Sequence, residues 1–548
     1  MTSRPFLKHI PFILLILALL LFGLFTFRDY GLSWDEPLFY EYGEALGYAY
    51  APANWFRADF DLNHAYGSSG DDHKNRGPAY LILARTPVHI LQSLGIDPPS
   101  AWHLVNFLTF LLGVYFVYRL SLRWMGEWAA FGAATLFATQ PLLLGHAFIN
   151  PKDIPFLVFF TGALLFGFEM VDVLSNSSKN KKQKTSQVIL ASFFLGIATS
   201  IRVLAPLAGL LVLIYAANRQ PPTANHQPPT VNHQPPTLPL LAYALLSILF
   251  MLASWPYLWE SPLKNFFEVF LFMSDNPTGL QVLFGGELYR AYELPRRYLP
   301  TLLAITLTEP VWPLFALGLI TTAWKSISTI RRLPTPDSRI PATNRQQPTD
   351  YWLAITAFLI TFLYVLLLRP PMYDGFRHFL FILPPLFITA GLGLQFFLNR
   401  LEKIKPRVIF WLYAGMVFII LAVNILPAAK LHPFEYAYYN SLVGGTRGAF
   451  RVYETDYWLT CYKQAVQLLN ARAPASLYVH REAYIAAAYA SSGLNVIEAR
   501  GHLNDIASGD YILVNTRANE DRKTFRDAPT LFEVGRGGAA FCVVKQAP

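Results

Sequence analysis

Long apolar runs are the feature that most constrains the fold of this chain. A helix that crosses a membrane needs about 20 mostly apolar residues, and runs of that kind lie near residues 10–27, 101–120, 128–147, 154–173, 238–256, 299–324, 351–368, 378–398 and 408–427. A further apolar stretch, residues 187–215, is interrupted at Ser200-Ile201-Arg202 and at Pro206. Because an arginine in the middle of one span is costly, we interpret this stretch as two short helices that meet at Arg202. The sequence therefore predicts an α-helical polytopic membrane protein with about eleven transmembrane helices.

The composition agrees with this prediction and excludes other classes of protein. Charged residues make up 14% and hydrophobic residues 53% of the chain, whereas about 25% of the residues of a soluble protein are charged. The same values exclude a disordered or collagen-like chain. The two cysteines, Cys461 and Cys542, are too few for a disulfide framework or a thiolate metal site, and we expect them to be unpaired.

Basic residues gather in alternate loops when the N-terminus is placed in the cytoplasm, as the positive-inside rule requires. The basic residues of these loops are Arg119, Arg123, Lys179, Lys181, Lys182, Lys184, Arg219, Lys325, Arg331, Arg332, Arg339, Arg345, Arg400, Lys403, Lys405 and Arg407. The formal net charge of +9 therefore reflects membrane topology, and nucleic acid is excluded as a partner. Two of these loops, 218–237 with its repeated Asn-His-Gln-Pro-Pro-Thr and 325–350, are expected to be disordered cytoplasmic linkers.

The hydropathy falls after Pro427, which divides the chain into two predicted domains. Residues 1–427 form the transmembrane domain, whose first external loop is 28–78, and residues 428–548 form an extracytoplasmic domain. Strand-like and helix-like runs alternate in the second domain, which indicates a small α/β fold. The strand-like runs are Leu477–His480, Asn495–Glu498, Tyr511–Asn515 and Phe541–Lys545, and the helix-like runs are Trp458–Ala471 and Glu482–Ala490.

Carboxylates lie in two places on the predicted external side. Asp35 and Glu36 follow the first span, and Asp153 follows the third. One such carboxylate can accept a proton from a hydroxyl group while another binds substrate or a cation. The alternatives are a solvated or helix-starting pair at Asp35-Glu36 and a helix cap at Asp153.

Two arginines lie on the same side, from which the positive-inside bias should exclude them. Arg202 is at the tip between spans five and six, and Arg377 is where span ten begins. The guanidinium group suits phosphate oxygens, which it binds bidentately. A sugar linked to polyprenyl phosphate would place its phosphate at the arginines and its anomeric carbon near the acids. A single displacement by an activated hydroxyl would invert that carbon, and the arginines would offset the charge on the leaving phosphate.

Two further groups of residues remain candidates for the site. His64, Asp71, Asp72 and His73 in the first loop are candidates for a divalent cation, although their spacing fits no specific metal site. Glu309 is the most unusual acid, because it lies near the middle of span eight. Its neighbour Pro310 suggests a broken helix with Glu309 in a polar substrate cavity.

With these residues the chain resembles the GT-C type membrane glycosyltransferases of the PMT/ArnT-like superfamily (protein O-mannosyltransferases and aminoarabinose transferases, glycosyltransferase family 39). The resemblance covers about residues 8–427 and rests on Asp35-Glu36, Asp153, Arg202 and Arg377. It implies a GT-C-like fold with Asp35 as catalytic base or acceptor-binding residue, Glu36 as its supporting neighbour and Asp153 as a second acidic site for the acceptor or a metal. Arg202 and Arg377 would contact the carrier phosphate.

The remaining substrate-binding candidates are Lys152 and His378, beside Asp153 and Arg377, together with Glu309. Many relatives have Arg-Tyr where this chain has Arg377-His378. The C-terminal domain has no feature of protein mannosyltransferases, which puts a protein acceptor in doubt. Its aromatic residues, such as those of Asp456-Tyr457-Trp458, are expected to dock the domain on the membrane surface rather than to bind sugar.

The sequence therefore predicts an inverting glycosyltransferase of the bacterial cytoplasmic membrane, with its active site on the outer face. Its partners would be a polyprenyl-phosphate sugar donor, an unknown acceptor and membrane lipids. The sequence requires no cofactor and assigns no set of metal ligands. Whether a divalent cation takes part in the reaction is left open. The alternatives are a transporter or flippase for lipid-linked sugars, and a polysaccharide polymerase or ligase. Transporters often contain internal repeats, and no repeat between the two halves of this chain is visible, which disfavours transport.

Overall fold

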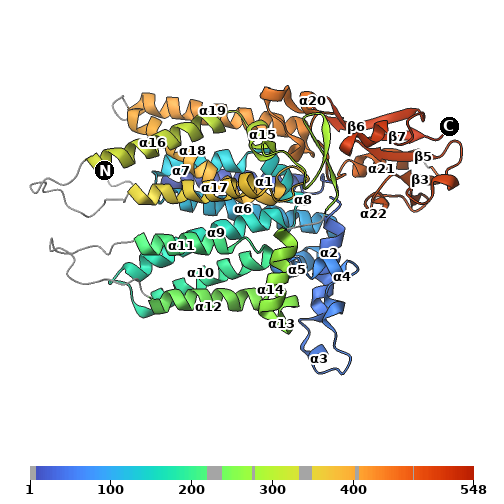
Figure 1. Cartoon of the computed structure of the whole chain (residues 1–548). Coiled ribbons are helices and arrows are strands. Elements are labelled where there is room, and N and C mark those ends of the chain that lie inside the picture. Colours follow the sequence, from blue (N-terminus) through green and yellow to red (C-terminus); the bar gives the residue numbers. More distant parts are fainter. Residues whose placement is uncertain (1–7, 219–236, 275–277, 332–347, 402–405, 473) are drawn as a thin grey trace, which may run out of the picture.

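A bundle of helices with a small β-sheet at one end makes up the protein (Figure 1). The computed structural model describes residues 8–218, 237–274, 278–331, 348–401, 406–472 and 474–548. In this part of the chain five helical segments are long and apolar enough to cross a membrane, or up to seven if each of two bent pairs counts as one span. The five are α6 (Pro98–Ser121), α9 (Asp153–Ser175), α10 (Lys181–Ile201), η5 with α18 (Arg377–Ile382 and Leu383–Leu401) and α19 (Pro406–Leu431). The chain is thus a multi-pass membrane protein.

Proline accounts for the two bent pairs. The first pair, α7 (Glu127–Ala138) and α8 (Pro141–Ile149), bends by 63° where Pro141 begins the second helix. The second pair, α15 (Tyr298–Thr306) and α16 (Val311–Arg331), bends by 113° next to Pro310. Proline lacks the N–H group of the helical ladder and clashes with the preceding turn, so a helix ends before it.

Every apolar stretch that the sequence analysis selected is helical, but the number of spans is not settled at eleven. The stretches outside the five long helices and the two bent pairs form shorter apolar helices, which are α1 (Ile10–Thr26), α11 (Pro206–Asn218), α12 (Thr237–Ala253) and α17 (Pro348–Leu368). The predicted break at Arg202 is confirmed, because α10 ends at Ile201 and α11 begins at Pro206.

The two predicted cytoplasmic linkers lie for the most part outside the described residues. The first linker, 218–237, falls there except for Asn218 and Thr237, which are the last residue of α11 and the first of α12. The second, 325–350, was predicted too long at both ends, because α16 continues to Arg331 and α17 begins at Pro348.

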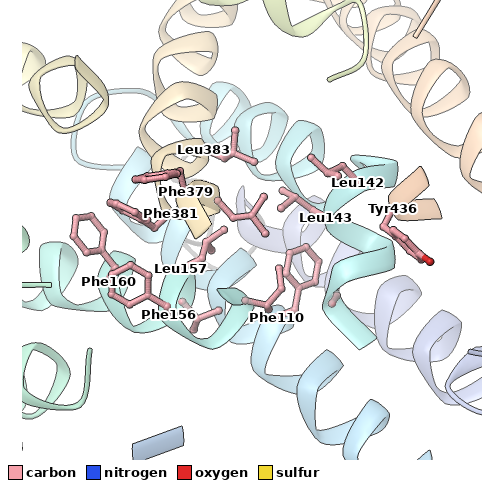
Figure 2. Packing of buried hydrophobic residues seen from close by; sticks show 14 of the residues in the cluster. Phe110, Leu142, Leu143, Phe156, Leu157, Phe160, Phe379, Phe381, Leu383 and Tyr436 are labelled. Carbon is pink, nitrogen blue, oxygen red and sulfur yellow. The ribbon is translucent and has the colours of Figure 1, made fainter. Parts of the chain in front are cut away.

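Aromatic packing brings the N-terminal end of α9 against η5. The rings of Phe156 and Phe160 on α9 lie 5.0 and 4.9 Å from the ring of Phe381 (Figure 2). Leu142 and Leu143 of α8 belong to the same buried cluster. Aromatic pairs at this separation add to the free energy of burial. The packing therefore holds together the chain ends that carry Asp153 and Arg377.

Short elements cover the end of the bundle that carries the sheet. The loop after α1, residues 28–78, contains α2 (Glu36–Ala45), η2 (Leu46–Tyr48), α3 (Pro52–Trp55), η3 (Leu62–Ala65) and α4 (Gly70–His73), and α5 (Ala79–Ser93) follows it. Between α12 and α15 lie α13 (Tyr257–Glu260), α14 (Pro262–Ser274) and an antiparallel hairpin of β1 (Gln281–Phe284) and β2 (Glu287–Arg290). The sequence analysis missed this hairpin, although Gly285-Gly286 between two short apolar runs is a hairpin signal. Both glycines adopt positive φ, at 65° and 85°.

The C-terminal segment folds as the predicted small α/β unit. Its sheet has the order β4-β3-β5-β7-β6, in which β3 is parallel to β4 and β5, and β7 is antiparallel to β5 and β6. Four strands correspond to the predicted runs and one, β6, was missed. The strands are β3 (Ser476–Val479), β4 (Asn495–Glu498), β5 (Tyr511–Asn515), β6 (Thr530–Arg536) and β7 (Ala539–Gln546). The helices are α20 (Gly445–Ala449), α21 (Tyr462–Asn470) and α22 (Ala483–Ala487), with short 3₁₀ turns η6 (Glu435–Ala437), η7 (Ser441–Val443), η8 (Leu503–Asp505) and η9 (Arg517–Arg522).

The two cysteines are paired, so the expectation that they are unpaired was wrong. Cys461, which caps the start of α21, forms a disulfide bond with Cys542 in β7. Sequence alone could not show this pairing, because the two residues meet only when α21 packs on the sheet.

Candidate functional site

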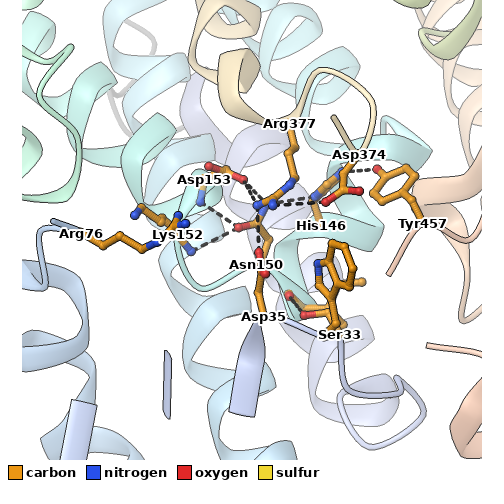
Figure 3. A network of polar contacts seen from close by, with 12 residues as sticks. Ser33, Asp35, Arg76, His146, Asn150, Lys152, Asp153, Asp374, Arg377 and Tyr457 are labelled. Carbon is orange, nitrogen blue, oxygen red and sulfur yellow. Dashed lines mark hydrogen bonds and ion pairs between the residues drawn. The ribbon is translucent and has the colours of Figure 1, made fainter. Parts of the chain in front are cut away.

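Four charged residues from four separate parts of the transmembrane region lie together, and Figure 3 shows three of them, Asp35, Asp153 and Arg377. The Nη1 atom of Arg377 lies 3.0 Å from Oδ2 of Asp35 and 3.2 Å from Oδ2 of Asp153. Arg202 forms an ion pair with the other carboxylate oxygen of Asp153. The structure therefore brings together Asp35, Asp153, Arg202 and Arg377, the residues on which the sequence prediction rested.

Each of these residues lies at the end of a helix. Asp35 is the N-cap residue of α2, but its side chain makes no capping hydrogen bond, so the carboxylate is free to contact Arg377. Asp153 begins α9, where the helix dipole favours a negative charge. Arg202 is the C-cap residue of α10, and Arg377 begins η5. The charged residues of the site thus lie at helix ends, while the interiors of these helices are mostly apolar.

The two aspartates have different surroundings. The side chain of Asp153 is 1% exposed and accepts a hydrogen bond from the Asn150 amide at 3.0 Å, in addition to its two arginine contacts. The side chain of Asp35 is 26% exposed and has Arg377 as its ion-pair partner. Asp35 can therefore reach a bound molecule, whereas the oxygens of Asp153 are already engaged.

Glu36 does not belong to the charged cluster. Its carboxylate is fully buried, lies 3.0 Å from Nε2 of His103 on α6 and accepts hydrogen bonds from the Ser33 backbone N–H and the Tyr40 hydroxyl. These contacts fasten the start of α2 to α6. Glu36 thus anchors the start of α2, directly after the N-cap residue Asp35.

A cavity of about 80 Å³ lies beside the cluster and has a mixed lining. Its basic side chains are Arg76, Lys152, Arg202 and His378. The apolar part of its lining includes Trp255, Val269, Phe270, Met273 and Tyr364, from the bundle and from α14. Such a combination of cations and apolar side chains suits a molecule with an anionic head and a hydrocarbon tail.

Lys152 is the most unusual of these cations. It is 6% exposed, and its ammonium group lies 5.3 Å from the ring of Phe39. Within the described ranges, no carboxylate forms an ion pair with it. A buried ammonium group without a counter-ion is costly, so an anion in the cavity would stabilise it.

The C-terminal unit contributes a second buried charge pair to the cluster. Arg517 of η9 lies 2.7 Å from Oδ1 of Asp374, whose Oδ2 lies 3.2 Å from Arg377. On its other side Arg517 lies 3.7 Å from Glu454. The guanidinium of Arg517 also stacks over the indole ring of Trp34, 4.4 Å from its centroid. A row of acidic and basic side chains thus runs from Glu454 in the C-terminal unit through Arg517, Asp374 and Arg377 to Asp35.

Burial shifts the pKa values of two acids in this row, Glu454 and Asp374. It raises the pKa of Glu454 to about 8; the nearby charge of Arg517 opposes this shift and that of Asp374 adds to it. Burial also raises the pKa of Asp374, against the attraction of Arg517 and Arg377. Glu454 is therefore largely uncharged at neutral pH, and Asp374 is the carboxylate that balances Arg517.

Sequence reasoning missed Arg517, Asp374 and Glu454. Asp374 lay within the segment selected for Arg377, but no motif marked it as a partner of the C-terminal unit. Arg517 and Glu454 carry no local signal, because only the folded chain brings them near Arg377.

The aromatic residues at the start of the C-terminal unit do not dock on the membrane surface, which corrects the prediction made for them. Tyr457 and Trp458 are buried. The hydroxyl of Tyr457 lies 2.9 Å from Nε2 of His146, and Nδ1 of His146 lies 3.1 Å from the Asn150 amide that contacts Asp153. The indole ring of Trp458 lies 5.3 Å from the Arg377 guanidinium. Tyr457 and Trp458 therefore pack against the residues that surround the charged cluster.

Glu309 is not brought into the cluster. The break in the helix that was predicted beside it is present, but its Oε1 accepts a hydrogen bond from the Ser441 backbone N–H at 2.9 Å. The carboxylate therefore caps η7, the turn at 441–443. It does not line the cavity that contains Lys152.

The acids and histidines of the first loop serve separate contacts. Asp71 pairs with Lys74 at 2.8 Å, Asp72 pairs with Arg76 at 2.5 Å, and Nδ1 of His73 lies 2.8 Å from the Tyr66 carbonyl oxygen. In the part of the chain that the structure describes, no group of three or more His, Cys, Asp or Glu residues could hold a metal ion.

The overall fold is similar to that of proteins with known structures, although neither a protein-family model nor a curated protein matches the sequence. The crystal structure of ArnT from Cupriavidus metallidurans in the apo state superposes with a TM-score of 0.50 and 13% sequence identity, over 97% of this chain and 97% of that chain. The same protein bound to undecaprenyl phosphate gives a TM-score of 0.49 at 13% identity, over 97% and 98% of the two chains. The oligosaccharyltransferase of Archaeoglobus fulgidus in the apo form gives 0.49 at 11% identity, over 93% of this chain and 70% of that chain.

These findings define the class of fold. The chain is a polytopic membrane protein with the GT-C fold, and its helical bundle with a small C-terminal sheet unit is similar to that of apo ArnT. The fold predicted from the sequence resemblance is therefore confirmed.

Proposed function

We propose that this protein is an inverting glycosyltransferase that moves a sugar from a polyprenyl-phosphate carrier to an acceptor hydroxyl group at the outer face of a bacterial cytoplasmic membrane. One observation carries the proposal. A partly exposed carboxylate, Asp35, is held by Arg377, and Asp153 connects Arg377 to Arg202, which lines a cavity that combines basic with apolar side chains. The GT-C fold supports the same class of enzyme, and domain 1–427 is its proposed catalytic domain.

The cavity supplies the donor site. Arg202, Lys152 and Arg76 would bind the phosphate oxygens, and the apolar lining from α14 would accept the first isoprene units. Lys152 gains the counter-ion that its burial requires. ArnT, which shares the fold in its apo state, has been crystallised with undecaprenyl phosphate, a carrier of this class.

The two aspartates would have different roles in the reaction. Asp35 accepts the proton of the acceptor hydroxyl, whose oxygen attacks the anomeric carbon from the face opposite the phosphate. The bond between that carbon and the phosphate oxygen breaks, and its electron pair leaves with polyprenyl phosphate. Asp153 keeps Arg202 and Arg377 in place, because its own oxygens are saturated by these arginines and Asn150.

The cations would stabilise the transition state. Negative charge grows on the leaving phosphate as the bond breaks, and Arg202 with Lys152 would face that charge without reorganisation. Arg377 contacts both aspartates and so keeps the base and the phosphate site at a constant separation. His378 lines the same cavity and would contact the donor.

The proposal is tested with the purified protein in nanodiscs and a panel of polyprenyl-phosphate sugars, with membrane extracts as the source of acceptor. The expected result is release of free polyprenyl phosphate from one donor, with inverted configuration in the product. A parallel reaction with EDTA decides whether a divalent cation takes part. If no donor is consumed and the same donors cross the bilayer of proteoliposomes, the chain is a transporter and the proposal fails.

A further inference from the structure

A second polar cavity lies outside the membrane-spanning helices, between the β1–β2 hairpin and the C-terminal unit. Its volume is about 350 Å³. Residues 278–281, which lead into β1, form one wall, and Arg481, Arg517, Ala518 and Glu520 form the other. No step of the proposed donor chemistry uses this cavity.

Two guanidinium groups lie close together here. Arg481 and Arg517 both stack against the indole ring of Trp34, with their Cζ atoms 5.1 and 4.4 Å from the ring centroid. Arg517 is balanced by Asp374 at 2.7 Å. Among the described residues, the one carboxylate that pairs with Arg481 is Glu482, at the long distance of 3.6 Å.

Glu482 itself is shared. Arg500 lies at the same distance of 3.6 Å from its Oε1 atom. The Nε–H group of Arg481 is buried and has no hydrogen-bond acceptor within the described ranges. Burial and the neighbouring charge of Arg517 both lower the pKa of Arg481. Arg481 therefore lines the cavity with a charge that the distant and shared Glu482 balances only weakly.

The position of the cavity relates it to the proposed base. Trp34, against which both arginines stack, directly precedes Asp35. Its carbonyl oxygen accepts a hydrogen bond from the Tyr484 hydroxyl of α22 at 2.7 Å, which fixes the C-terminal unit over this segment. In Figure 3, Arg76 and Lys152 of the donor cavity lie on one side of Arg377, and Asp374, the partner of Arg517, lies on the other. The two cavities thus flank the charged cluster.

We infer that this second cavity is the acceptor subsite, and that it binds an anionic group, a phosphate or a carboxylate, carried by the acceptor sugar. Arg481, which lines the cavity, would bind the anion through its terminal N–H groups, as guanidinium groups bind phosphate and carboxylate. Thr278 and Gln281 would contact the sugar hydroxyl groups. Glu520 also lines the cavity, and Lys523, 3.1 Å from its Oε1, offsets its charge.

The inference rests on the proposed function, because an acceptor subsite requires a transfer reaction. The inference goes beyond the proposed function, because it names the chemistry of the acceptor and the residue, Arg481, that selects this acceptor. A neutral sugar would leave the Arg481 charge unbalanced and would bind more weakly.

Binding of small probes by the full-length protein in nanodiscs tests the inference directly. The probes are glucose 6-phosphate, glucuronate and glucose, and binding is followed by saturation-transfer NMR. We expect the phosphate or the carboxylate probe to bind, and the glucose probe to bind at least several-fold more weakly. Comparison of the two anionic probes shows which anion the acceptor carries.

Four variants separate this cavity from the donor cavity. Arg481→Gln should weaken binding of the anionic probe about ten-fold, since one charge-assisted pair is lost, and Arg481→Lys should retain part of the affinity. Arg500→Gln is the matched control, because Arg500 contacts the same Glu482 but does not line the cavity. Lys152→Gln removes a cation of the donor cavity and should leave the probe bound.

Two outcomes would overturn the inference. Loss of probe binding in Lys152→Gln but not in Arg481→Gln would place the anion in the donor cavity only. Absence of any binding that depends on Arg481 would exclude an anion subsite there. Neither outcome affects the proposed function, which fails only if the wild-type protein releases polyprenyl phosphate from no donor.

Discussion

The guanidinium of Arg517 and the carboxylate of Asp374 form an ion pair of 2.7 Å in which both side chains are almost fully buried, at 2% and 0% exposure. Asp374 also contacts Arg377, the residue that holds Asp35. The C-terminal unit is therefore connected to the proposed base through buried charges. This connection makes the unit part of the surroundings of the proposed catalytic site, which its sequence did not reveal.

The loss of stability and activity on removal of Arg517 should be compensated by a second substitution at Asp374. Arg517→Met leaves Asp374 with Arg377 alone, and the loss of one partner from a buried pair costs about 3–5 kcal/mol. We expect a lower thermal unfolding midpoint and a lower kcat for release of polyprenyl phosphate. In Arg517→Met with Asp374→Asn both should recover, because Glu454 is largely uncharged at neutral pH and Arg377 keeps Asp35 and Asp153. Equal losses in the single and the double variant would show that the pair does not couple the unit to the site.

The stability of the protein should depend on pH through Glu454. Its pKa in the folded protein is about 8, above the ordinary value of 4.5, mainly because it is buried. Between these values the folded state binds a proton that the unfolded state has released, so stability falls as pH rises. Glu454→Gln removes this contribution. Its unfolding midpoint, measured from pH 5 to 8.5 in detergent, should fall less with pH than that of the wild type; parallel curves would contradict the assignment.

Lys152 should determine the affinity for the donor phosphate. Lys152→Gln removes one charge-assisted contact, which corresponds to about a ten- to hundred-fold weaker affinity for polyprenyl phosphate. Lys74→Gln is the matched control, because Lys74 is a lysine of the first loop that pairs with Asp71. Binding of undecaprenyl phosphate by both variants, measured with the protein in detergent, checks the prediction. Equal affinities in the two variants would exclude Lys152 from the donor site.

The adjacent acids Asp35 and Glu36 should respond differently to amide substitution. Glu36→Gln disturbs a fully buried contact with His103 and should lower the free energy of unfolding by about 3 kcal/mol or more. Asp35→Asn alters a partly exposed side chain and should leave the unfolding midpoint within a few degrees of the wild type. Thermal unfolding of both variants distinguishes these roles. A large destabilisation by Asp35→Asn and none by Glu36→Gln would reverse the assignment.

Sequence order and sidedness were sufficient to find the centre of the site. Asp35, Asp153, Arg202 and Arg377 stood at the ends of apolar runs on one predicted side, and helix ends on the same side of a bundle can meet. The arginine contacts that distinguish the two aspartates were not predictable, because Arg377 reaches Asp153 only through the packing of α9 against η5.

Other features required the folded chain. Pro310 marked the break in one span, whereas the break at Pro141 was missed, and the bends of 63° and 113° could not be predicted from the sequence. Tyr457 was read as a membrane anchor because aromatic residues are common at membrane surfaces; its hydroxyl instead contacts His146 inside the protein. Glu309 was read as a cavity acid because of its place in an apolar run, whereas it caps a turn of the C-terminal segment.

The central claim is that Asp35 is the base of a lipid-phosphate sugar transferase. The most direct measurement is single-turnover release of polyprenyl phosphate by the wild type and by Asp35→Asn, after both have been shown to bind the donor equally. The account predicts equal binding and a release rate lower in the variant by about 10²–10⁴-fold, the usual contribution of a general base. Release by Asp35→Asn at the wild-type rate would contradict it.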